Sequence, residues 1–181
     1  MLRLAVVSAL VLLAGCRGET PNPAPASMAA DPNAPTRTET SGPVPFRIDG
    51  RLDFVRGERV LKTIDIEIAD TDSTRERGLM ERPTIPPDTG MLFIFPSAEP
   101  QAFYMASTPK SLDIQFYGPD STLLNIAEDA EPYSFDTLPS VGPAQFVVEV
   151  PAGYSRRLGL VPGDKIRWTD TRATAAPDSL G

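Results

Sequence analysis

The chain has 181 residues, a formal net charge of -7, no histidine and one cysteine, Cys16. This length suits one domain, the 41% of hydrophobic residues can supply a core, and the acidic balance argues against nucleic acid as a partner. Without histidine, and with its only cysteine near the start, the folded part has no disulfide, no Cys/His zinc site and no cysteine nucleophile. We therefore expect neither a metal nor a cofactor.

The first residues have the pattern of an exported protein. Arg3 precedes an apolar run over residues 4–13, which is shorter than the roughly 20 residues needed to span a bilayer. The run ends in Leu13-Ala14-Gly15-Cys16, which resembles the lipobox of bacterial lipoprotein precursors. This resemblance implies a signal peptide over residues 1–15, a lipid on Cys16, and a membrane-anchored protein of the cell envelope. We expect it to face the periplasm from the outer or the inner membrane.

Residues 16–45 are rich in Pro, Ala, Thr and Asn and have hardly any large apolar side chains. Such a segment cannot bury enough surface to offset its ordering entropy, so we predict a disordered, proline-rich tether. Residues 170–181 have a similar composition and are expected to form a loose tail. A single β-rich domain is predicted between them, over residues 46–169.

The first elements of this domain are a hairpin and a helix. Residues 51–55 and 60–69 flank a turn, and in the second segment Ile64, Ile66 and Ile68 alternate with other residues, which is typical of a half-buried strand. Residues 70–73 offer helix N-caps. A short helix is expected from residue 74, ending around Met80 to Arg82 ahead of Pro83.

The remaining elements are mostly short strands. Residues 91–95 (MLFIF) are apolar on both faces and predict a central strand. Further strands are predicted at residues 102–105, 112–117, 122–127, 146–150 and 165–168, with one helical turn over residues 153–158 closed by Gly159 and a turn at residues 161–164 that contains Asp164. About eight short strands and two short helices indicate a mostly β (α+β) fold, a compact barrel-like sheet rich in antiparallel pairs.

Several short motifs resemble the bacterial and archaeal family catalogued as domain of unknown function 192. They are Arg77-Gly78-Leu79-Met80, Gly90-Met91-Leu92-Phe93 with Phe95, Met105, Thr108, Leu112-Asp113-Ile114, Glu149, Ala152-Gly153 and Gly163-Asp164. The resemblance covers nearly the whole predicted domain. It implies a compact, mostly β domain that is often exported, and no settled biochemical activity.

The sequence departs from the family pattern in one segment. Tyr104 stands where the family usually has tryptophan, Ser107 replaces an asparagine, and Ser111 replaces a proline, with Pro109 two positions earlier. If this segment lines a site, the site of this member is altered.

Carboxylates are the remaining candidates for catalysis. They are Asp113, Glu128, Asp129, Asp136 and Glu149. A hydrolase can use two of them as acid and base. The alternative is that Asp113 and Glu149 lie on the solvent faces of their strands, as alternation predicts. Glu128, Asp129 and Glu131 lack the spacing of a calcium loop, so a solvated acidic loop is favoured.

Residues 104–113 join two predicted strands and carry several hydroxyl groups, so we predict that they border the main cleft. The candidate pocket residues are Met80, Arg82, Tyr104, Ser107, Thr108 and Asp113. In the alternative interpretation the segment is a plain connection in which Thr108 and Asp113 satisfy local backbone groups. Arg77 and Arg82 suit either an anionic ligand or a neighbouring carboxylate. The methionines and aromatic residues nearby are expected mainly in the core.

The preferred hypothesis is a non-catalytic domain that binds a polar small molecule or serves as an accessory protein, tethered to a membrane by its lipid anchor. The first alternative is an envelope hydrolase that uses paired carboxylates. The second is a structural or assembly partner without a ligand site, which would show a large exposed apolar patch and no cleft.

Overall fold

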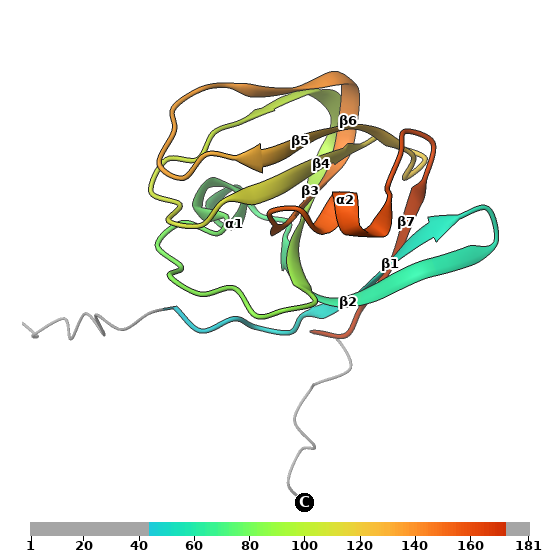
Figure 1. Cartoon of the computed structure of the whole chain (residues 1–181), viewed down its shortest axis with the longest axis horizontal. Coiled ribbons are helices and arrows are strands. Elements are labelled where there is room, and N and C mark those ends of the chain that lie inside the picture. Colours follow the sequence, from blue (N-terminus) through green and yellow to red (C-terminus); the bar gives the residue numbers. More distant parts are fainter. Residues whose placement is uncertain (1–43, 173–181) are drawn as a thin grey trace, which may run out of the picture. The chain divides into compact units, whose positions relative to one another are not determined.

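A computed structural model describes residues 44–172. The predicted signal peptide, Cys16, nearly all of the predicted tether and the tail from residue 173 onward lie outside the described residues. Within the described part, seven strands and two short helices follow one another along the chain (Figure 1). The mostly β fold expected from the sequence is confirmed.

The strands form one mixed sheet in the order β5-β4-β6-β3-β2-β1-β7. Their bounds are β1 Gly50–Arg56, β2 Arg59–Ala69, β3 Thr89–Phe103, β4 Leu112–Tyr117, β5 Leu123–Ala130, β6 Leu138–Pro151 and β7 Lys165–Asp170. Neighbouring strands are antiparallel except β2 and β3, which are parallel and are connected through the segment that contains the first helix.

The two outer strands of the sheet, β5 and β7, approach each other at one end. The Leu123 amide donates to the Asp164 carbonyl at 2.7 Å, and the Ile166 amide donates to the Ser121 carbonyl at 3.1 Å. Only one bridge, between Thr122 and Lys165, joins these edges. The sheet is therefore strongly curved and barrel-like but not closed.

The first helix, α1 (Asp72–Arg77), is shorter than predicted. Thr71 caps its start by accepting a hydrogen bond from the Thr74 amide. The helix ends because Gly78 takes a φ of 50° and its amide donates back to the Thr74 carbonyl. A glycine therefore ends the helix ahead of Pro83. The second helix, α2 (Tyr154–Leu158), is closed by a left-handed Gly159 as predicted.

Seven strands replace the predicted eight because two predicted strands merge. Residues 91–95 and the first two of residues 102–105 belong to one long strand, β3, which pairs with β6 along both its halves. The register shifts between Ile94 and Glu99, where Pro96 interrupts the ladder because proline has no amide hydrogen to donate. Met105 lies beyond the end of the strand.

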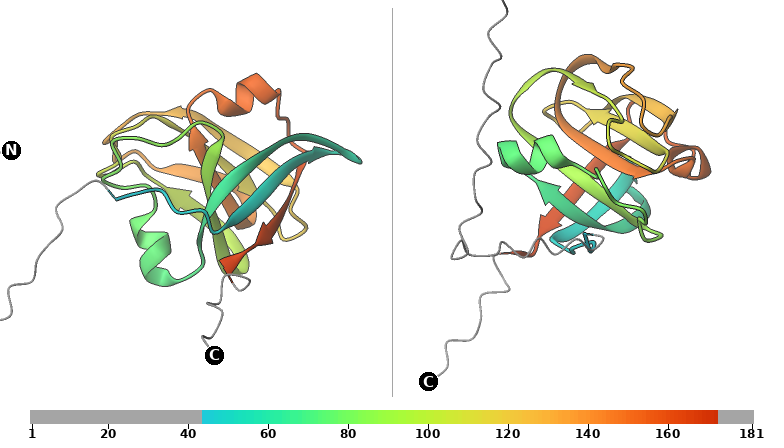
Figure 2. Two further views of the ribbon diagram at one scale, coloured as in Figure 1. Left: turned by 90° about the horizontal axis from the view of Figure 1, so that it is seen from below. Right: turned by 90° about the vertical axis from the view of Figure 1, so that its left-hand side faces the viewer.

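The core has two layers. One cluster takes residues from all seven strands, such as Leu52, Ile66 and Val148, and also contacts α2. The other lies on the opposite face of the central strands and includes Phe93, Ile114 and Leu79, the last just after α1. The ribbon views in Figure 2 show the two helices, α1 and α2, well apart on the outside of the sheet.

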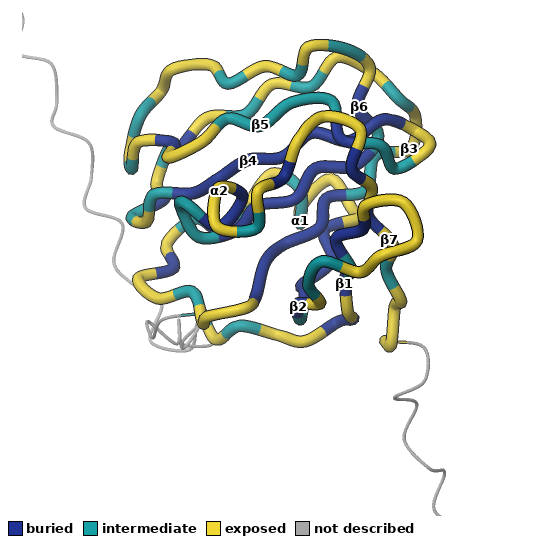
Figure 3. The backbone as a smooth tube through the Cα atoms, turned by 45° about the vertical axis from the view of Figure 1, so that its right-hand side comes forward, coloured by how far each residue is buried: buried dark blue, intermediate teal, exposed yellow. Residues whose placement is uncertain are grey.

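All six residues of β4 are buried, because both of its faces are covered (Figure 3). This strand therefore has no solvent face on which Asp113 could lie.

Candidate functional site

A cavity of about 260 Å³ lies between α1, the strand β3 and the segment that follows β3. Its lining comprises Arg75, Glu76 and Arg77 of α1, the following residues Gly78, Leu79 and Met80, Phe93, Phe95, Gln101, Ala102 and Phe103 of β3, then Tyr104, Thr108 and Glu149. We call this cavity the α1–β3 pocket. Its wall combines aromatic and aliphatic side chains with polar and charged ones, including two arginines and two glutamates.

Glu149 is the buried carboxyl group of the pocket. It lies on β6 between Met91 of β3 and Ile114 of β4, and only 6% of its surface is exposed. Its Oε2 atom is buried and has no hydrogen-bond partner among the described residues. Burial raises the pKa of this carboxyl from 4.5 to about 8, so the group is mostly protonated at neutral pH. The expectation that Glu149 lies on a solvent face is wrong, because α1 and the segment after β3 cover that face.

Gly78 brings the backbone close to this carboxyl group. A Cβ atom at position 78 would lie 3.3 Å from the Phe93 ring and 3.7 Å from Glu149 Oε2. The residue also has a positive φ, which side chains disfavour. Glycine therefore both ends α1 and leaves space above Glu149.

The aromatic wall is held by edge-to-face contacts. The rings of Phe93 and Phe103 meet at 5.1 Å and those of Phe95 and Phe103 at 6.4 Å. The Arg75 guanidinium lies 5.5 Å from the centre of the Phe95 ring and donates to the carbonyls of Asp70 and Ile94. Arg75 is thus fixed as part of the wall.

Three of the predicted pocket residues line the α1–β3 pocket. These are Met80, Tyr104 and Thr108. Tyr104 is 52% exposed and stands at the mouth. Thr108 is buried, and its hydroxyl donates to the Ala106 carbonyl at 3.2 Å, so its polar group is partly used within the loop.

Ser107 lines a separate, shallow hollow with Glu81 and Tyr133. All three of these residues have positive φ angles. The Ser107 carbonyl accepts a hydrogen bond from the Glu81 amide at 2.7 Å, which ties the segment after α1 to the segment after β3.

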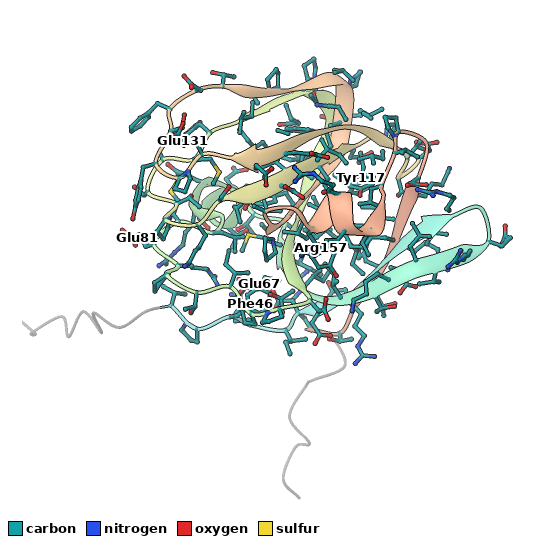
Figure 4. All side chains as sticks on the ribbon, viewed as in Figure 1. Phe46, Glu67, Glu81, Tyr117, Glu131 and Arg157 are labelled. Carbon is teal, nitrogen blue, oxygen red and sulfur yellow. The ribbon has the colours of Figure 1, made fainter. Side chains whose placement is uncertain are left out.

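Arg82 forms a buried ion pair and does not line the α1–β3 pocket. Its two terminal nitrogens reach the two oxygens of Glu67 at 2.6 and 2.8 Å, and Phe46 packs over its guanidinium. Glu67 and Phe46 are labelled in Figure 4. The Arg47 amide also donates to Glu67 at 2.6 Å. The side chain of Arg82 therefore anchors the chain after α1 to β2 and to the start of the domain.

Asp113 is fully buried under backbone amides. Its Oδ1 accepts from Asp129 and Gly153 at 3.0 Å each, and its Oδ2 accepts from Ser155 at 2.8 Å. The carboxylate thus holds the start of α2 and the end of β5 to β4. The expected solvent exposure of Asp113 is wrong, and its contacts fit the alternative in which it satisfies local backbone groups.

The other carboxylates are exposed. Glu128 and Asp129 pair with Arg156 at 3.0 and 2.5 Å, and Asp136 lies in an exposed loop. Over residues 44–172 no group of three potential metal-ligating side chains is arranged around one point, and no helix there is long and apolar enough to cross a membrane. Asp164 accepts from the Val161 amide within its turn, as predicted, and also binds Arg56.

The sequence indicated Glu149 as a candidate catalytic carboxylate but not as a pocket residue. Gln101 was not predicted at all. The signal for Glu149 was its place in the run Phe146–Val150, where apolar residues occupy both faces of the strand. An acidic residue within such a run is buried whichever face it occupies.

The family model that matches the chain is DUF192, described as "Uncharacterized ACR", and it covers residues 54–168. The chain belongs to this family. The match extends over nearly the whole described DUF192 domain and confirms the resemblance carried by the short motifs. No curated protein matches the chain.

Two solved structures resemble this DUF192 protein. A Sinorhizobium meliloti protein described as a "putative transcription regulator" is 35% identical, with a TM-score of 0.64, over 70% of this chain and 98% of that chain. A Novosphingobium aromaticivorans protein of unknown function is 33% identical, with a TM-score of 0.63, over 78% of this chain and 98% of that chain.

Glu149 makes the stability of the domain depend on pH. Because its pKa is about 8 in the folded state and 4.5 in the unfolded chain, the folded state keeps a proton that the unfolded chain has lost between these values. Stability therefore falls as the pH rises through this range. Relative to Glu149→Gln, the wild type is expected to lose about 1.4 kcal/mol of unfolding free energy between pH 6 and pH 7. Urea denaturation of both proteins measures this change. If the difference between their unfolding free energies is the same at pH 6 and pH 7, the pKa of Glu149 is not raised.

Proposed function

We propose that this DUF192 protein is a non-catalytic small-molecule-binding domain whose ligand occupies the α1–β3 pocket and hydrogen-bonds to Glu149. The observation that supports this most strongly is the buried Oε2 atom without a partner. Leaving a buried polar atom unpaired costs roughly 1–3 kcal/mol, so such atoms are rare unless they serve another purpose. A ligand that donates a hydrogen bond would remove this cost.

The position of the family motifs agrees with this proposal. Arg77 to Met80, Phe93, Phe95, Thr108 and Glu149 are among the residues that carry the resemblance, and all of them line the pocket. Tyr104, where the family usually has tryptophan, stands at the mouth. The same pocket in this member is therefore expected to accept a ligand of somewhat different shape.

Methionine methyl groups provide the test of binding. The chain has five methionines, and Met80 lines the pocket while Met91 and Met105 are buried. We expect compounds from a panel of aromatic amines, carboxylates, amino acids, amides and monosaccharides to shift the ¹³C-methyl NMR signal of Met80 in the full-length chain. Met80→Leu assigns that signal. A panel that leaves the Met80 signal unmoved throughout would contradict the proposal.

A hydrolase is the second candidate, because two carboxyl groups line the pocket. Glu149, with its raised pKa, has the protonation state of a general acid, and Glu76 of α1 is the other carboxyl group. Glu76 is exposed on the helix, which disfavours a tuned acid–base pair. Turnover of a pocket ligand that is lost in both Glu149→Gln and Glu76→Gln would establish the hydrolase instead.

We also propose that the domain is held at a membrane of the cell envelope by a lipid on Cys16. The support is the run Leu13-Ala14-Gly15-Cys16 behind a short apolar segment. Two or three acyl chains give firm anchoring at about 0.8 kcal/mol per buried methylene. Cys16→Ser is expected to move the protein out of the membrane fraction or to leave the precursor uncut. A cut chain that still fractionates with membranes would contradict the anchor.

A further inference from the structure

We infer that the ligand of the α1–β3 pocket is a small zwitterion of the α-amino acid class with an apolar side chain, whose ammonium group meets Glu149 and whose carboxylate meets Arg77. This inference rests on the proposed function and names the class of molecule bound at the same site.

The first support is that two groups without side-chain partners, the Arg77 guanidinium and the Glu149 carboxyl, line the same pocket. Arg77 is exposed and lines the pocket, and its guanidinium makes no ion pair or hydrogen bond with any residue in the 44–172 range, although its backbone carbonyl accepts from the Met80 amide. Its neighbour Gly78 lies directly over Glu149, since a Cβ there would be 3.7 Å from Oε2. A cationic side chain and an unpartnered carboxyl group therefore line the same pocket, and the two ends of an amino acid offer a partner to each.

The second support is the apolar wall next to these groups. Phe93, Phe103, Leu79 and Met80 line the pocket beside Glu149. The cavity, at about 260 Å³, lies below the roughly 300–1,000 Å³ of sites for drug-sized ligands. It suits a molecule with one aromatic or aliphatic side chain.

The third support is the charge balance around Glu149. The charged and titratable groups that line the pocket with it are Arg75, Glu76, Arg77 and Tyr104, and its strand partners Met91 and Ile114 are apolar. A simple amine would bring a cation next to two arginines. A simple carboxylate can accept a hydrogen bond from protonated Glu149 but brings no cation to pair with its ionised form. A zwitterion satisfies both groups without adding net charge.

Binding has a proton balance that can be measured. The free Glu149 carboxyl is mostly protonated at pH 7, whereas pairing with an ammonium group favours its ionised form. The ligand ammonium keeps its protons, and the proton of Glu149 passes to the buffer. Close to one proton should therefore be released for each zwitterion bound at pH 7.

Isothermal titration calorimetry of the full-length chain tests this with three matched probes. They are L-phenylalanine, phenethylamine, which lacks the carboxylate, and 3-phenylpropionate, which lacks the ammonium group. We expect L-phenylalanine to bind at least tenfold more tightly than either, and titrations in two buffers of different ionisation enthalpy to show the released proton. Equal binding of the three probes, or binding of L-phenylalanine without proton release, would overturn the inference.

Two variants and one control assign the contacts. Glu149→Gln should abolish proton release, and Arg77→Gln should remove the advantage of L-phenylalanine over phenethylamine. Arg59→Gln, an exposed arginine in the β1–β2 hairpin, should change neither. If amino acids fail to bind while another compound shifts the Met80 signal, the ligand class is wrong and the proposed function stands. If no compound shifts that signal, the ligand class and the proposed function are both wrong.

Discussion

Replacing Arg82 by methionine is expected to lower the free energy of unfolding by about 3–5 kcal/mol, the usual cost of breaking a buried ion pair from one side. Arg82 and Glu67 are both almost fully buried and are joined by two hydrogen bonds of 2.6 and 2.8 Å. Methionine fills much of the same space but leaves the Glu67 carboxylate without its cationic partner. The loss therefore reflects an uncompensated buried charge more than lost packing.

Urea denaturation at pH 7 measures this effect, with Arg59→Met as the control. Arg59 is exposed, so its replacement should change stability by less than about 0.5 kcal/mol. The double variant Glu67→Leu with Arg82→Met should regain part of the loss, because an apolar pair of similar volume often replaces a buried ion pair at little cost. A loss below about 1 kcal/mol for Arg82→Met would contradict the buried pair and would return Arg82 to the group of candidate ligand contacts.

Asp113→Asn is expected to cost about 2–4 kcal/mol, since three backbone amides converge on this carboxylate and hydrogen bonds to charged groups contribute about 1.5–3 kcal/mol each. The amides belong to Asp129, Gly153 and Ser155. Asparagine replaces one acceptor oxygen by an NH₂ group, which faces a donor. The end of β5 or the start of α2 then loses a contact with β4.

The matched control for this variant is Asp129→Asn. Asp129 is half exposed and pairs with Arg156 at the surface, where such pairs contribute roughly 0–1 kcal/mol. Thermal and urea unfolding should therefore separate the two variants clearly. If Asp113→Asn unfolds like the wild type and yet loses ligand binding, Asp113 is a ligand contact, and the backbone role described above is wrong.

Local sequence patterns predicted the elements whose ends are set by local chemistry. The β1–β2 hairpin turns at Gly57, the strand β4 spans the predicted residues, and α2 closes at Gly159. The predicted end of α1 ahead of Pro83 is wrong, because Gly78 ends the helix first. A glycine ends a helix because it readily adopts a positive φ. A proline matters only where the helix would otherwise continue up to it.

Burial of polar side chains was harder to predict, because it depends on segments far apart in the chain. Alternation in β4 and β6 indicates two faces but does not reveal that α1 covers one and α2 the other. Asp113 and Glu149 therefore looked exposed and are buried. The pairing of Arg82 with Glu67 arises from the parallel neighbours β2 and β3, a connection that no local motif encodes.

Only part of the candidate pocket was predicted, because the pocket too combines segments that are far apart in the chain. Met80, Tyr104 and Thr108 lie in connecting segments, where polar and aromatic residues without a structural need stand out. The buried carboxyl of the pocket, Glu149, comes from β6, which lies far along the sequence from α1. Only the order β4-β6-β3 brings that strand beneath α1.

The affinity of a pocket ligand for Glu149→Met, which removes both polar atoms of the side chain, tests the central proposal most directly. The compound that shifts the Met80 signal most strongly would be titrated into the wild type, into Glu149→Met, and into Glu128→Met, which replaces a carboxylate that pairs with Arg156 on the surface. We expect at least a tenfold loss for Glu149→Met, which corresponds to about 1.4 kcal/mol, and no change for Glu128→Met. Equal affinities in all three proteins would contradict a ligand that binds through Glu149.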